Sequence, residues 1–149
     1  MKKKGTVTLS VLLLVFAALL SHAQNSFHGA AAHLKHYQAL YYVNYNDEKH
    51  IKATIRNINN AINDPRLKDK LTVELVAFGE GVAVFQKQNS YDSLLWNLKS
   101  KGVILAQCEN TLRERNIPKS DILDFVSFVP SGNGEIIIRS QEGWAVIHP

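Results

Sequence analysis

Cys108 is the only cysteine in the chain, and its position favours thiol chemistry. It stands between an apolar run at residues 103–107, typical of a buried strand, and residues 109–113, typical of the first turns of a helix. Ligands of open α/β sheets gather outside the carboxyl ends of the strands. The start of a helix also carries a partial positive charge, which stabilises a thiolate. We therefore expect Cys108 to be the nucleophile of a functional site.

The alternative for Cys108 is a small, inert core side chain, because free cysteines are among the most buried residues in proteins. Local charges do not decide between the two roles. A helix start favours a thiolate by about 0.3–1 kcal/mol, and the charge of Glu109 opposes it by about 1 kcal/mol. Asn110 and Thr111 are equally suited to orient a persulfide and to fill the first helical turn by satisfying its free backbone groups.

The loop Gly79-Glu80-Gly81 is a second candidate, because it follows an apolar strand at residues 71–78. Its backbone N–H groups are suited to bind an anion at a helix start. Glu80 is an acid–base candidate if it faces Cys108. A tight turn is the structural alternative for the glycines, and the loop lacks the position and spacing of a dinucleotide fingerprint.

No cofactor is required by the residues present. Of His28, His33 and His36, only the last two would share a helical face, so we expect no metal site. Nothing in the sequence calls for a flavin or a nucleotide. The basic residues of the second half are expected to form a solvated face: Lys99, Lys101, Arg113, Arg115 and Lys119.

Residues 1–23 have the three parts of a secretory signal peptide. Lys2-Lys3-Lys4 form the positive start, residues 11–20 the apolar centre, and Ser21-His22-Ala23 the small-residue site before cleavage. The whole apolar run at residues 7–20 is shorter than the roughly 20 residues that span a bilayer. We therefore expect a bacterial protein that is periplasmic or secreted, without a membrane segment after cleavage.

Removing this leader changes what the composition implies. Of 149 residues 126 remain, enough for one domain, and loss of three lysines lowers the net charge from +4 to +1. No case for nucleic-acid binding remains at that charge. An exported chain with one cysteine forms no internal disulfide, so its thiol is inert, paired with another chain or chemically used. Residues 24–36 are interpreted as a flexible segment and residues 37–149 as the domain.

Strands and helices are expected to alternate, which indicates an α/β fold with a parallel sheet. Strands are expected at residues 37–43, 71–78, 103–107, 125–129 and 144–148, and helices at residues 47–63, 82–86, 91–101, 110–115 and 132–141. Ser90 is expected to cap the third of these helices, with Leu94 facing the core. Parallel strands would bring Asn44, the loop at residues 79–81, Cys108 and the loop at residues 132–134 to one edge.

Residues 102–112 (GVILAQCENTL) resemble the cysteine segment of the DsrE/DsrF-like proteins, particularly their exported single-domain members. Further pieces fit the same family: FGEGV at residues 78–82, RNI at 115–117, VPSG at 129–132 and EGWA at 142–145. The resemblance covers residues 37–149, and it is spread over the domain rather than confined to one motif.

The resemblance implies a three-layer α/β/α fold with a five-stranded parallel sheet, and homo-oligomers that are trimers or hexamers. In the sulfur-relay members, the cysteine at this strand end accepts sulfur as a persulfide and passes it to a thiol-bearing partner protein. Cys108 matches that cysteine, which implies a sulfurtransferase-like sulfur carrier. The alternatives are a non-enzymatic module that binds a small ligand or a partner at the same edge, and an oligomeric structural protein; in both the cysteine is inert.

Overall fold

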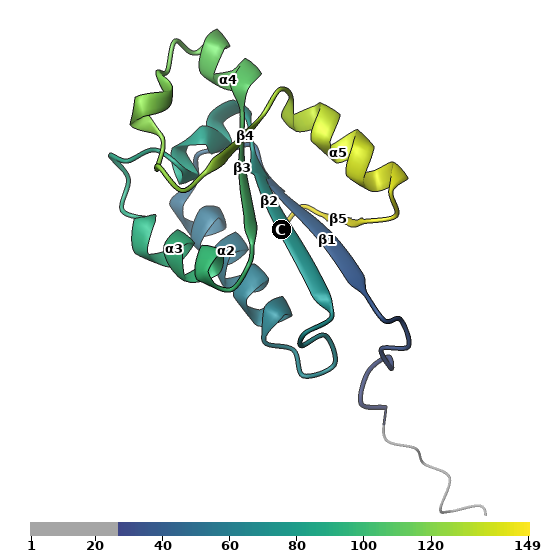
Figure 1. The fold of residues 1–149 in the computed structure, drawn as a ribbon. Helices are drawn as coiled ribbons and strands as arrows, with labels where there is room; N and C mark the ends of the chain where they lie inside the picture. Colours follow the sequence, from purple (N-terminus) through teal and green to yellow (C-terminus); the bar gives the residue numbers. More distant parts are fainter. Residues whose placement is uncertain (1–26) are drawn as a thin grey trace, which may run out of the picture. The chain divides into compact units, whose positions relative to one another are not determined.

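A computed structural model describes residues 27–149, and a sheet of five parallel strands forms its centre (Figure 1). The strands are β1 (Tyr37–Val43), β2 (Leu71–Ala77), β3 (Ile104–Cys108), β4 (Ser127–Val129) and β5 (Ala145–Ile147). Their order across the sheet is β4-β3-β2-β1-β5, and all neighbouring strands are parallel. The predicted fold class is confirmed.

Helices cover both faces of the sheet and complete the three layers. They are α2 (Glu48–Ile62), α3 (Asp92–Ser100), α4 (Glu109–Glu114) and α5 (Gly132–Gln141), with the 3-10 helices η1 (Gly79–Val84) and η2 (Lys119–Asp121). From β1 to β4 each strand is added on the same side of the last, so crossovers of one hand place α2 and α3 on one face. The chain then returns across the sheet to β5, and α5 lies on the other face (Figure 1).

The two faces bury unequal cores, because the side chains of each strand alternate between them. On β2, Leu75 belongs to the larger core under α2 and α3, whereas Val76 belongs to the smaller core. The smaller core consists of Leu40, Val76, Ala106 and Trp144, with Tyr42, Val129 and Ile136 packed against it. The strands are therefore almost continuously apolar, as is usual for a parallel sheet that is covered on both faces.

Helix α2 shows how the sequence determines an element locally. Ile51, Ile55 and Ile58 form one apolar stripe at helical spacing, and all three are buried in the larger core. The side chain of Asp47 caps the helix by accepting a hydrogen bond from the backbone N–H of His50 at 2.8 Å. The predicted helix is confirmed, and of the two residues that the sequence offers as its cap, Asn46 and Asp47, the structure uses Asp47.

Helix α3 differs from the expectation in two details. Its N-cap is Tyr91 rather than Ser90, and Leu94 is 41% exposed instead of facing the core. A helix that begins at Asp92 puts Tyr91, Leu95 and Leu98 on one stripe, and these three are buried. Leu94 lies next to that stripe, so the core does not reach it.

Strand β4 is shorter than expected, because it begins at Ser127 and not at residue 125. Phe125 instead packs edge-on against Trp96 of α3, with ring centroids 5.2 Å apart. The backbone N–H of Val126 donates to the carbonyl of Leu123 at 3.0 Å, which closes a turn before the strand.

Residues 32–149 form one compact unit, and residues 27–36 contain no helix or strand. The predicted signal peptide at residues 1–23 and its cleavage site lie outside the described residues. No helix within residues 27–149 combines the length and the hydropathy that a membrane span requires.

Candidate functional site

Cys108 is the last residue of β3 and lies where the connections of two neighbouring strands diverge. The register pairs it with Val129, the last residue of β4. After β3 the chain enters α4, whose Leu112 joins the larger core, whereas after β4 it enters α5 on the opposite face (Figure 1). Such a divergence between adjacent parallel strands is where open α/β sheets bind their ligands.

The thiol of Cys108 is largely buried, with 4% of the residue exposed, and it serves as the N-cap of α4. Its Sγ accepts a hydrogen bond from the backbone N–H of Thr111 at 3.5 Å. A fixed N–H donor of this kind interacts most strongly with an anionic acceptor, such as a thiolate or a persulfide anion. The hydrogen bond therefore suits a nucleophilic sulfur, whereas the burial of Cys108 limits the access of a reaction partner to it.

Thr111 connects the cysteine to the loop that follows β2. While its backbone N–H reaches Cys108, its Oγ1 accepts a hydrogen bond from the backbone N–H of Gly79 at 2.9 Å. Thr111 is itself buried. Of the two roles considered for Thr111, its hydroxyl therefore performs the structural one, and its backbone serves the sulfur.

The side chains of Glu109 and Asn110, which follow the cysteine, contact other side chains at the surface. Glu109 forms an ion pair with Lys119, which offsets the negative charge expected to oppose a thiolate at Cys108. The side-chain oxygen of Asn110 accepts a hydrogen bond from Arg113. Both side chains therefore have protein partners beside the cysteine.

The two glycines of the loop after β2 are required by close packing. Gly79 has a φ of +57°, and a Cβ added to Gly81 would lie 2.1 Å from the carbonyl oxygen of Val43. The N–H of Gly79 donates to Thr111, and that of Gly81 donates to the carbonyl of Phe78 at 3.0 Å. Both N–H groups are occupied, which favours a tight turn over an anion site.

Asn44 follows β1 at the same edge of the sheet and is exposed. Its carbonyl oxygen lies 3.3 Å from the position of a Cβ added to Gly79, so the loops after β1 and β2 touch through their backbones. Parallel strands thus bring Asn44, Gly79 and Cys108 to one edge.

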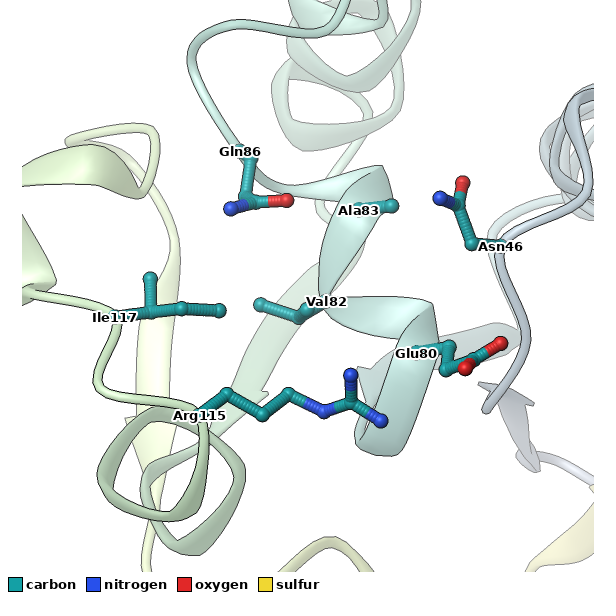
Figure 2. Close-up of a pocket in the computed structure, with 7 residues that line it drawn as sticks. All are labelled: Asn46, Glu80, Val82, Ala83, Gln86, Arg115 and Ile117. Carbon is teal, nitrogen blue, oxygen red and sulfur yellow. The ribbon is translucent and has the colours of Figure 1, made fainter.

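Glu80 is one of the residues that line an open pocket of about 410 Å³ beside η1, and its carboxylate points away from Arg115 (Figure 2). Arg115, from the C-cap of α4, lines the same pocket. Cys108 is not among the residues that line it. Arg115, which the sequence assigns to a solvated face, therefore shares a pocket with the acidic residue of the loop.

Gln107 is a site residue that the sequence analysis missed. Its side chain is fully buried, and its Nε2 donates a hydrogen bond to the carbonyl oxygen of Cys108 at 3.0 Å. Its Oε1 is buried without a partner among the described residues. The sequence does contain a signal for Gln107: it is a polar residue at the end of an otherwise apolar strand, directly before the cysteine.

Histidine, cysteine and carboxylate side chains do not gather around a metal position anywhere in residues 27–149. His36 instead lies 3.0 Å from the hydroxyl of Thr72, within hydrogen-bond distance. The part of the chain that the structure describes therefore offers no donor set for a metal ion.

Known proteins resemble the chain in sequence and in fold. The model of the DsrE/DsrF-like family matches residues 26–149. A protein of unknown function from Methanobacterium thermoautotrophicum is 33% identical, with a TM-score of 0.71 over 76% of this chain and 99% of that one. A conserved protein of unknown function from Bacteroides thetaiotaomicron, 9% identical, shares the fold, with a TM-score of 0.63 over 81% of this chain and 100% of that one. No curated protein matches the chain.

Proposed function

The chain belongs to the DsrE/DsrF-like family, and from this premise we propose that it is an exported sulfur carrier holding a persulfide on Cys108. Membership of the family supports a role related to sulfur relay. One observation carries the finer proposal: Cys108 ends β3 beside the end of β4, with the N–H of Thr111 donating to its sulfur.

The proposed reaction moves one sulfur atom in two displacements. The Cys108 thiolate attacks the outer sulfur of a donor persulfide, the donor S–S bond breaks, and the donor leaves as a thiolate. Cys108 then carries the outer sulfur as a persulfide. An acceptor thiolate attacks that outer sulfur, and Cys108 leaves as a thiolate. No external oxidant or reductant is consumed, because each S–S bond broken is replaced by one formed.

The proposed reaction requires that a sulfur donor can reach the thiol of Cys108. Because Cys108 is 4% exposed, a donor reaches Sγ only if the residues around the sulfur move to admit it. Once formed, the outer sulfur of the persulfide stands one S–S bond, about 2.05 Å, beyond Sγ. It is this atom that the acceptor must contact.

Polysulfide loading of the folded protein tests the proposal directly. Intact-mass spectrometry is expected to show a gain of one sulfur atom, and cyanide is expected to remove it as thiocyanate. The Cys108→Ser variant should gain none. No mass gain in the parent, or the same gain in both proteins, would exclude a persulfide on Cys108.

The burial of Cys108 favours a second candidate, a non-enzymatic binding module with an inert cysteine. A thiol reagent added to the native protein distinguishes the two. The sulfur-carrier proposal expects reaction in the folded state. If the thiol reacts only after unfolding in urea, the binding module becomes the better description.

Export belongs to the same proposal. The signal-peptide pattern of residues 1–23 supports export to the periplasm or the medium, and the mature protein is expected to begin at Gln24. Mass spectrometry of the protein recovered from its native compartment checks this start. A chain that retains residues 1–23 would contradict it.

A further inference from the structure

Gln107 is a fully buried polar residue whose side-chain amide is only half used. Its Nε2 donates to the carbonyl oxygen of Cys108 at 3.0 Å, whereas its Oε1 has no partner among the described residues. The other buried polar residues of residues 27–149 all form hydrogen bonds through their side chains: Thr54, Glu74 and Thr111. A buried acceptor without a partner destabilises a fold. The benefit of this amide therefore lies in its donor group.

The amide of Gln107 and the sulfur of Cys108 lie on opposite faces of β3, because side chains alternate along a strand. Leu105 belongs to the larger core, and so does Ala77, which pairs with Gln107 in the sheet. Ala106 belongs to the smaller core. Gln107 therefore faces the larger core and Cys108 faces the smaller one, so Gln107 can act on the sulfur only through the backbone.

The carbonyl that Gln107 contacts lies at the junction of β3 and α4. Cys108 ends the strand and is also the N-cap of the helix, with an extended backbone of φ −67° and ψ 119°. Because the peptide group is planar, rotation about ψ of Cys108 turns its carbonyl and the start of α4 together. The same rotation moves the N–H of Thr111, which donates to Sγ at 3.5 Å. A donor that holds the carbonyl therefore also holds this N–H against the sulfur.

We propose that Gln107 is a positioning residue for the sulfur chemistry, whose amide holds the Cys108 carbonyl so that the N–H of Thr111 stays directed at Sγ. The inference rests on the proposed function, because a fixed N–H donor interacts most strongly with an anionic sulfur. Since Gln107 acts through the backbone, it is a positioning residue and not a catalytic one.

Gln107→Met removes the amide but keeps a side chain of similar length. The free energy of unfolding should stay close to that of the parent, because an unpartnered acceptor is lost together with the donor. Gln107→Leu removes the same groups with a different shape and should behave alike. Thr54→Val is the matched control: Thr54 is also fully buried, and its hydroxyl donates to a backbone carbonyl, that of His50 at 2.9 Å, within α2. Urea unfolding measures the stability of each variant.

The backbone amide signal of Thr111 in an NMR spectrum reports the position of its N–H without any reaction. Cys108→Ala removes the sulfur and supplies the reference signal of this N–H without its acceptor. Gln107→Met and Gln107→Leu should move the signal from its place in the parent toward that reference, whereas Thr54→Val should leave it unchanged. A Thr111 signal that stays in place in both Gln107 variants would overturn the inference.

The rate of sulfur loading from polysulfide is the second measurement. Gln107→Met should load about tenfold more slowly than the parent, because a misplacement of about 1 Å can slow a reaction roughly 100-fold and the expected displacement is smaller. Thr54→Val should load at the rate of the parent. A folded Gln107→Met protein that loads as fast as the parent would overturn the inference. A parent that loads no sulfur would instead contradict the proposed function, and the Thr111 signal would then decide the role of Gln107 alone.

Discussion

At the scale of single residues, the surroundings of Cys108 are assembled from backbone groups more than from side chains. The sulfur receives a backbone N–H from Thr111, and the carbonyl of Cys108 receives the amide of Gln107. The hydroxyl of Thr111 in turn accepts the N–H of Gly79. Thr111 thus holds the loops after β2 and β3 together, so its removal should affect stability before chemistry.

Thr111→Val should lower the free energy of unfolding by about 1 kcal/mol, because it leaves the half-buried N–H of Gly79 without its acceptor. Thr111→Ser retains the hydroxyl and should recover most of the loss. Urea unfolding of the three proteins measures both differences. A valine variant as stable as the parent would show that the Gly79 N–H finds another acceptor.

At the scale of elements, a buried ion pair ties α5 to the sheet. Glu74 of β2 is 1% exposed, and it accepts a hydrogen bond from Nε of Arg139 at 2.8 Å. Arg139 also pairs with Glu135 at 2.9 Å, and its guanidinium lies 4.3 Å from the centre of the Trp144 ring. Charge, hydrogen bonding and ring contact therefore meet at one arginine between α5, β2 and the start of β5.

Replacing Arg139 with methionine should destabilise the protein by about 2–3 kcal/mol, because it leaves the Glu74 carboxylate buried without its cation. The side chain of Arg139 is a quarter exposed. The destabilisation should therefore lie at or below the lower limit of the range for broken buried ion pairs, about 3–5 kcal/mol. The double variant Glu74→Leu/Arg139→Met removes both charges and should be more stable than the single variant. Urea unfolding measures this cycle, and strictly additive losses would contradict a direct interaction.

The same pair predicts how stability depends on pH. Burial raises the pKa of the Glu74 carboxyl above its usual value, although the positive charge of Arg139 limits the rise. The folded state therefore keeps this proton to a higher pH than the unfolded chain does. The contribution of the Glu74 carboxyl to the free energy of unfolding therefore falls as the pH rises from the usual pKa to the raised pKa.

Glu74→Gln removes that proton equilibrium while it keeps an acceptor for Arg139. The stability of the variant minus that of the parent should therefore increase from pH 4 upward and become constant above the raised pKa. Urea unfolding at several pH values gives this difference. Glu114→Gln, at an exposed position of α4, is the matched control. Parallel pH profiles for the parent and Glu74→Gln would contradict the assignment.

At the scale of the whole molecule, α5 and β5 carry several exposed apolar side chains. Ile137 and Ile138 on α5 are 63% and 54% exposed, and Val146 on β5 is 39% exposed. Apolar side chains that gather on a surface indicate an interaction site. We propose that this surface takes part in the homo-oligomer that the family resemblance implies.

Ile138→Glu should dissociate that oligomer, because it buries a charge in the proposed interface. Leu94→Glu is the matched control, since Leu94 is also exposed and apolar but lies on α3, on the opposite side of the sheet. Light scattering coupled to size-exclusion chromatography measures the mass of each protein. A monomeric parent at micromolar concentration, or equal dissociation by both variants, would contradict the proposal.

Much of the fold and one part of the site follow from short stretches of sequence. The stripe of Ile51, Ile55 and Ile58 determines α2, and Gly102 with its φ of +87° follows the end of α3. The same local signals place Cys108 between β3 and α4. They suffice because helical periodicity, capping and chain reversal depend on residues within a few positions of each other.

The tertiary structure alone decided which of these residues meet. The pairing of Cys108 with Val129, the contact of Gly81 with Val43 and the bridge from Glu74 to Arg139 join segments far apart in the chain. The tertiary structure also decided the strand order, which places Cys108 where the connections after β3 and β4 leave toward opposite faces of the sheet. Such contacts arise when distant faces pack together, and the periodicity of one segment carries no information about which other segment covers it.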